Sequence, residues 1–97
     1  MGTTSPPNHL AEWYRSTLTD AWVAEMVATL QGATAVADAD DPVRLILSMA
    51  VPSDEVLYVV FEAASSAAVV RLCERAGLPP QRVTADVDAR IHVVGVS

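Results

Sequence analysis

The sequence predicts one α+β domain with the element order strand, helix, strand, strand, helix, strand. Two segments combine a helix-capping residue with apolar positions three and four apart, and four others alternate or read as short apolar runs. A chain of 97 residues is long enough for one domain and too short for two. We expect residues 1–8, rich in turn-forming residues, to be a mobile tail and residues 9–97 to form the domain.

The first strand and the first helix follow one another at the front of the chain. Residues 9–15 alternate and contain Trp13 and Tyr14, whose planar side chains suit a pleated sheet. Thr19 can cap a helix whose apolar stripe is Val23, Met26 or Val27, Leu30, and Ala33 or Thr34. We expect this helix to end between residues 31 and 37, because Gly32 weakens its last turns.

Two apolar runs in the middle of the chain predict a β-hairpin. Residues 43–50 and 56–62 are joined by residues 51–55, which contain Pro52 and the Ser53-Asp54 pair. Strict alternation along the first run puts one set of side chains on one face, namely Val43, Leu45, Leu47 and Met49. It puts the other set on the opposite face, namely Arg44, Ile46, Ser48 and Ala50.

The second half of the chain predicts a helix with a sharp end and a final strand. Ser65 or Ser66 can cap this helix, and its inward stripe is Val69, Leu72, Cys73 and Ala76. Gly77 suits the left-handed residue that ends a helix, and Pro79-Pro80 prevent continuation. Residues 82–91 alternate, with Val83 and Val87 inward. The ferredoxin-like βαββαβ fold keeps both crossovers right-handed and places both helices on one face of a four-stranded antiparallel sheet.

Charge and hydropathy exclude several classes of function. Twelve acidic residues outnumber six basic ones, so we expect neither a nucleic-acid partner nor a membrane-surface partner. The longest apolar run, residues 56–61, is too short to cross a bilayer. A single cysteine and an N-terminus unlike a secretory signal favour the cytoplasm.

Several segments match a known pattern: Asp54-Glu55, Phe61, Ala63, Ser65, Val69, Ala76-Gly77-Leu78-Pro79 and Arg82-Val83, with Glu12, Tyr14 and Leu18-Thr19 at the front. The chain thereby resembles a family of small ferredoxin-like domains, mostly of unknown function, that includes nickel-binding members. The resemblance implies a homodimer of the dimeric α/β-barrel type, with the two sheets facing one another. Its metal-binding members carry a His where this chain has Leu72, so we predict no metal site and no cofactor.

Polar residues gather on the sheet face that the helices leave uncovered. This predicted ligand site consists of Glu12, Tyr14, Arg44, Ser48, Tyr58, Glu62, Thr84 and Asp86. Phenols, hydroxyls, an Arg and carboxylates on adjacent strands can orient a small ligand inside an apolar pocket. Solvated sheet residues, or a dimer interface, would show the same alternation.

Three other groups favour ordinary structural roles. Asp86, Asp88 and His92 share parity but stand about 6.7 Å apart along an extended strand, which is too far for one metal ion. Cys73 lies on the apolar stripe of its helix and is expected to pack as a small hydrophobe. His9 has the parity of Trp13, which places it on the helix side.

The sequence therefore predicts a small homodimeric binding domain that encloses a small molecule or ion between paired sheets. One alternative is a cofactor-independent enzyme in the same cavity, with Tyr14 or Tyr58 and Glu12 or Asp86 as proton carriers and Arg44 holding an anionic substrate. Another is a protein-interaction or regulatory domain that uses the uncovered face as its contact.

Overall fold

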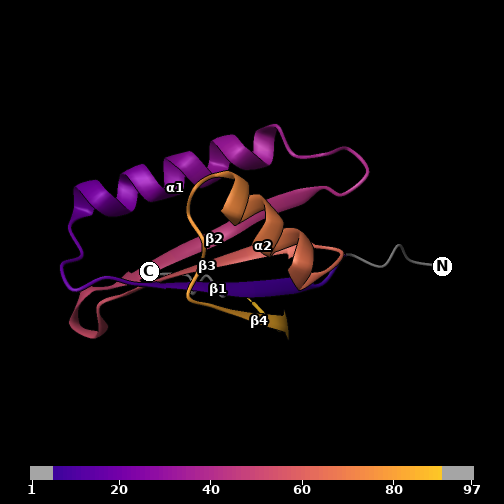
Figure 1. Ribbon diagram of the computed structural model, residues 1–97. Coiled ribbons are helices and arrows are strands. Elements are labelled where there is room, and N and C mark those ends of the chain that lie inside the picture. Colours follow the sequence, from indigo (N-terminus) through magenta and orange to yellow (C-terminus); the bar gives the residue numbers. More distant parts are fainter. Residues whose placement is uncertain (1–5, 91–97) are drawn as a thin grey trace, which may run out of the picture.

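A computed structural model describes residues 6–90 and has four antiparallel strands with both helices on one side (Figure 1). The strands are β1 (Asn8–Tyr14), β2 (Val43–Val51), β3 (Val56–Ala63) and β4 (Arg82–Val87), in the sheet order β2-β3-β1-β4. The helices are α1 (Asp20–Ala35) and α2 (Ser66–Arg75), and the short 3-10 helix η1 (Pro52–Asp54) links β2 to β3. The predicted ferredoxin-like βαββαβ arrangement is confirmed.

Both helices begin at predicted capping residues. The Thr19 hydroxyl accepts a hydrogen bond from the backbone N–H of Trp22 at 3.1 Å, and the Ser65 hydroxyl accepts one from Ala68 at 3.2 Å. The end of α2 is also as predicted, since Gly77 has a φ of 76° and the Leu78 N–H donates to the Cys73 carbonyl at 2.8 Å. Local sequence signals therefore determine where these helices begin and where α2 ends.

The core lies between the helices and one face of the sheet. Alternate residues of β1 and β3 supply its sheet side, namely Ala11, Trp13, Leu57, Val59 and Phe61. Met26 and Leu30 of α1 and Val69, Leu72 and Cys73 of α2 supply its helix side. His9 is buried as well, with 2% exposure, as its parity predicts. The sheet face opposite these residues is called the open face below.

The N-terminal boundary differs slightly from the prediction. β1 begins at Asn8, and the Pro7 carbonyl accepts a hydrogen bond from the Ala63 N–H at 3.1 Å. The prediction of a tail over residues 1–8 is therefore wrong for these two residues. At the other end, β4 stops at Val87 and residues 88–90 are not part of a strand, so the predicted strand over residues 82–91 is too long. Residues 1–5, Ile91 and the ligand candidate His92 lie outside the described range.

A β-bulge in β2 reverses the faces of the second half of that strand. Leu45 pairs with Phe61 but Leu47 pairs with Val60, so Ile46 is an extra residue with no partner of its own. Ser48 consequently pairs with Val59, whose side chain belongs to the core, and lies on the helix side. The predicted open-face position of Ser48 is wrong, because one inserted residue exchanges the two faces of a strand. The same shift moves Ala50 off the open face, and Leu47 and Met49 onto it (pairs Ala50 with Leu57 and Met49 with Tyr58).

A second irregularity lies in β4. Thr84 pairs with Leu10 and Val87 pairs with Asn8, so two residues of β4, at positions 85 and 86, lie opposite the single residue His9. Asp86 takes up this excess with a φ of 55°. Val87 therefore shares the open face with Asn8, and its predicted inward position is wrong. The backbone N–H of Asp86 donates to His9 Nδ1 at 3.4 Å.

Candidate functional site

The open face is mostly apolar in its middle. Pairing across β2, β3 and β1 places on it Leu10, Leu47, Met49, Val51, Val56 and Val60. Val56 and Val60 are buried, whereas Met49 of the outer strand β2 is 54% exposed. Figure 1 shows both helices on the other side of the sheet. The face is thus an apolar surface that the helices leave uncovered.

The carboxylate of Glu12 is nearly buried within this face. Glu12 stands on β1 between Tyr58 of β3 and Arg82 of β4, and it is only 7% exposed. Its Oε1 accepts a hydrogen bond from the Tyr14 hydroxyl at 2.6 Å, and its Oε2 lies 3.7 Å from Arg82 Nε. This distance to Arg82 exceeds hydrogen-bond length, so Oε2 keeps the capacity to accept a donor from a ligand.

The bond to Glu12 also sets the ionisation of Tyr14. The hydrogen bond that the Tyr14 hydroxyl donates to Glu12 raises the pKa of Tyr14 above its usual range. Desolvation and the negative charge of Glu12 raise this pKa further. Arg82 opposes these effects. The phenol therefore stays protonated at neutral pH and acts as a hydrogen-bond donor.

Gln81 holds the strand end that carries Tyr14. Pro79 and Pro80 precede it and have no N–H group for the edge of β1. The Gln81 side-chain amide supplies the missing pair, since Oε1 accepts from the Tyr14 N–H at 3.3 Å and Nε2 donates to the Tyr14 carbonyl at 3.4 Å. The Gln81 backbone N–H donates to the Glu12 carbonyl at 2.9 Å. A side-chain amide thus extends the β1–β4 pairing past the start of β4.

The structure brings together three of the eight predicted site residues, Glu12, Tyr14 and Tyr58. Arg44 and Glu62 form an ion pair of 3.3 Å at the other end of the face, beside Asn8. That end is four residues along β1 from Glu12, or about 13 Å. Thr84 lies between the two ends, opposite Leu10.

The remaining two predicted residues stand apart from Glu12, Tyr14 and Tyr58. Ser48 is exposed on the helix side of β2, and Asp86 is exposed at the irregularity of β4. The sequence reasoning did not select Arg82, although strand parity would have found it opposite Glu12. It also assigned Leu47 and Met49 to the other face, because no sequence signal marks the bulge.

Elsewhere in residues 6–90, the reactive groups do not form a second site of this kind. Cys73 is fully buried, which raises the pKa of its thiol to about 12, so it packs as a hydrophobe as predicted. Within residues 6–90, no three His, Cys, Asp or Glu side chains stand close enough to share a metal ion. Neither helix in this part of the chain is long and apolar enough to span a membrane.

Comparison with known proteins supports the fold. A crystal structure of SCO4226 from Streptomyces coelicolor A3(2) aligns with a TM-score of 0.65, over 93% of this chain and 98% of that chain. The sequence identity is 22%. No family model and no curated protein matches the chain. The two proteins share a fold.

Proposed function

We propose that the protein acts as a homodimer whose open faces pair and enclose a small molecule or ion. The observation that carries this proposal is a nearly buried carboxylate, Glu12, on an apolar sheet face that neither α1 nor α2 covers. An apolar wall with a few polar groups is the usual character of a small-ligand site.

The apolar part of the open face supports pairing. Leu10, Leu47 and Val51 are half-buried, and Met49 is more than half exposed, although all four lie on one surface. Removing apolar surface from water contributes roughly 25 cal/mol per Å², so a few hundred Å² supply several kcal/mol before association costs. A second copy of the same face is a self-complementary partner for such a surface.

The polar part supports a ligand with a hydrogen-bond donor or a positive charge. Glu12 offers a free lone pair on Oε2, and the rings of Tyr14 and Tyr58 flank it from the same strand and from β3. The protonated Tyr14 phenol suits binding better than general-base catalysis. For this reason binding ranks above the enzymatic alternative. The lone, buried thiol of Cys73 supports a place in the reducing cytoplasm.

Sedimentation velocity at micromolar concentration tests the pairing. Met49→Asp puts a charge on the open face and should yield monomer, because the charge would be desolvated at the interface. Ser48→Asp is the matched control, since it adds the same charge one residue away on the opposite, exposed side of β2. A monomeric wild-type chain, or equal effects of the two substitutions, would refute the proposed dimer.

Native mass spectrometry of the protein purified from its own host tests the enclosed ligand. We expect the wild-type protein to appear as a dimer with the mass of a bound small molecule added. This added mass should be lost in Glu12→Gln, because the substitution keeps the shape of the side chain and removes its charge. Arg44→Ala, about 13 Å along the sheet, should retain it. Loss in Arg44→Ala with retention in Glu12→Gln would move the site to the other end of the face.

A further inference from the structure

The surface formed by the two helices has a hollow that the open face does not involve. It lies between the second half of α1 and the end of α2, with a volume of about 340 Å³. Thr29, Gly32, Ala33, Val36 and Ala37 line it from one side, and Leu72, Arg75 and Ala76 from the other. This volume is at the lower end of the range of small-molecule pockets, about 300–1,000 Å³.

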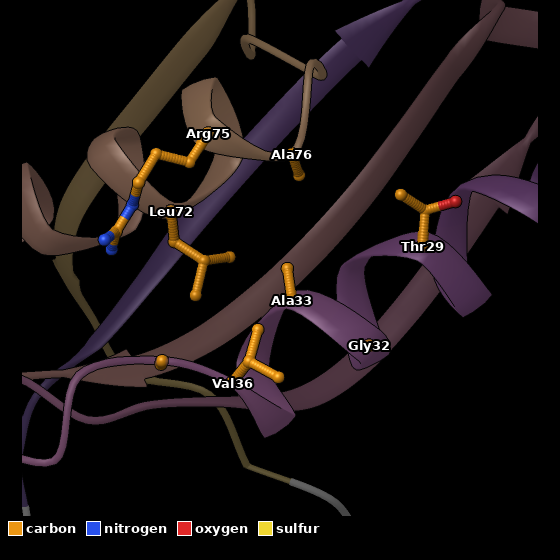
Figure 2. A pocket seen from close by; sticks show the side chains of 8 residues that line it. Thr29, Gly32, Ala33, Val36, Leu72, Arg75 and Ala76 are labelled. Atoms are coloured by element: carbon orange, nitrogen blue, oxygen red, sulfur yellow. The ribbon is translucent and has the colours of Figure 1, made fainter.

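The walls of the hollow are mostly apolar. Figure 2 shows Ala33 of α1, and Val36 just after the end of α1, facing Leu72 of α2 across it. Val36 is 84% exposed, an unusual state for a large aliphatic side chain at a helix end. A Cβ atom added at Gly32 would meet no other heavy atom within 4 Å, so the space beside this glycine is open.

The two ends of the hollow differ in polarity. Arg75 is the single charged side chain among the lining residues, and Figure 2 shows its guanidinium beyond Leu72, with Thr29 at the opposite end. Among residues 6–90, no carboxylate forms an ion pair with Arg75. The neighbouring Arg71 is paired with Asp41 at 2.7 Å. Arg75 also borders a second hollow, together with Asp38, Asp41, Arg71 and Glu74. The apolar hollow thus ends at a guanidinium that has acidic neighbours and that pairs with none of them.

We propose that this hollow binds a small aliphatic carboxylate, with the acyl chain between α1 and α2 and the carboxylate at Arg75. A guanidinium fits a carboxylate by two parallel hydrogen bonds. Ala33, Val36 and Leu72 supply apolar contacts for the acyl chain. Residues 29–36 extend over about 10 Å at a rise of about 1.5 Å per residue, which matches an eight-carbon chain. The Arg75 guanidinium and this length together favour a medium-chain fatty acid.

Titration of the full-length protein with octanoate, followed by amide NMR, tests the proposal. We expect saturable shifts centred on Gly32, Ala33 and Ala76. Octyltrimethylammonium is the matched probe, because its alkyl chain is only one carbon longer and its charge is opposite. It should bind at least tenfold more weakly. Equal binding of the two probes, or octanoate shifts confined to the open face, would overturn the proposal.

Substitutions separate the charge from the space. Arg75→Gln should weaken octanoate binding by roughly tenfold or more, because a charge-assisted pair is lost, whereas Arg71→Gln should leave binding unchanged. Gly32→Leu should abolish binding by filling the hollow, with the fold checked by circular dichroism. Val36→Trp is a second filling variant if Gly32→Leu does not fold.

Two results would reassign the hollow. If Gly32→Leu or Val36→Trp folds and binds octanoate like wild type, the acyl chain does not lie there. If these variants instead change the sedimentation coefficient of the ligand-free protein, the hollow is a contact between copies of the chain. Because the open face does not contribute to the hollow, failure of this proposal would not affect the proposed dimer.

Discussion

The buried imidazole of His9 gives a sharp test of how β1 is held in the sheet. Its Nδ1 accepts the Asp86 N–H at 3.4 Å, so the ring proton lies on Nε2, which donates to the Ala63 carbonyl at 3.0 Å. One side chain thereby ties β1 to the end of β3 and to the irregular part of β4. His9→Phe keeps a planar aromatic ring at this position and removes both hydrogen bonds.

The two bonds are not of equal value. Ala63 is 1% exposed, so removing the donor to its carbonyl should cost about 1–3 kcal/mol. Asp86 is exposed and its bond is long, so its N–H can turn to water, and this loss should add no more than about 0.5 kcal/mol. We therefore expect His9→Phe to lower the free energy of unfolding by about 2 kcal/mol.

Urea unfolding followed by the fluorescence of Trp13 and Trp22 measures this difference. All variants are compared at one protein concentration, because the stability of the proposed dimer would depend on concentration. The midpoint should fall by roughly 1 M at the usual slopes of about 1–3 kcal/mol/M. His9→Gln is the control, since its amide nitrogen can reach the Ala63 carbonyl and should keep most of the stability. If His9→Phe is as stable as His9→Gln, the hydrogen bond to Ala63 does not carry this stability and the reasoning is wrong.

Further predictions concern titration and metal content. In a Tyr58→Phe background, Glu12→Gln should lower the Tyr14 pKa in an ultraviolet titration, because the hydrogen bond to the Glu12 carboxylate raises it; an unchanged pKa would contradict that bond. Burial raises the Cys73 pKa from 9.0 to about 12, so the unfolded chain releases this proton first and stability should fall as pH rises from 9 toward 12. Cys73→Ala should lessen that fall in stability. If the urea midpoints of wild type and Cys73→Ala fall equally between pH 9 and pH 12, the prediction is wrong. The purified protein should contain no stoichiometric nickel or zinc, and its unfolding should not respond to EDTA; about one metal ion per chain by elemental analysis would refute this.

Helix boundaries could be predicted from short stretches of sequence. Thr19 and Ser65 cap their helices with their own hydroxyls, and Gly77 ends α2 in a left-handed conformation. Each of these signals acts within a few residues, so it operates in the same way whatever the rest of the chain does. The hairpin of β2 and β3 was predictable for the same reason.

The faces of the strands were predictable only where pairing is regular. Alternation placed Glu12, Tyr14 and Tyr58 on one surface correctly, because β1 and β3 pair without interruption from Asn8 to Tyr14. It failed for Ser48, since Leu45, Ile46 and Leu47 read as continuously apolar and give no sign that the strand bulges. The bulge depends on how β2 pairs with β3, so it cannot be recognised from the residues of β2 alone.

The sequence by itself determined the element order, the helix caps and the buried stripes of the helices. It also determined the excess of acidic over basic residues, which disfavours nucleic acid as a partner. These depend on local propensity and on periodicity, which are written along the chain. Only the tertiary structure decided that Leu47 and Met49 face away from the helices, that Gln81 completes the edge of β1, and that α1 and α2 leave a hollow between them. These features depend on distances between residues far apart in the chain, and such distances are set by packing.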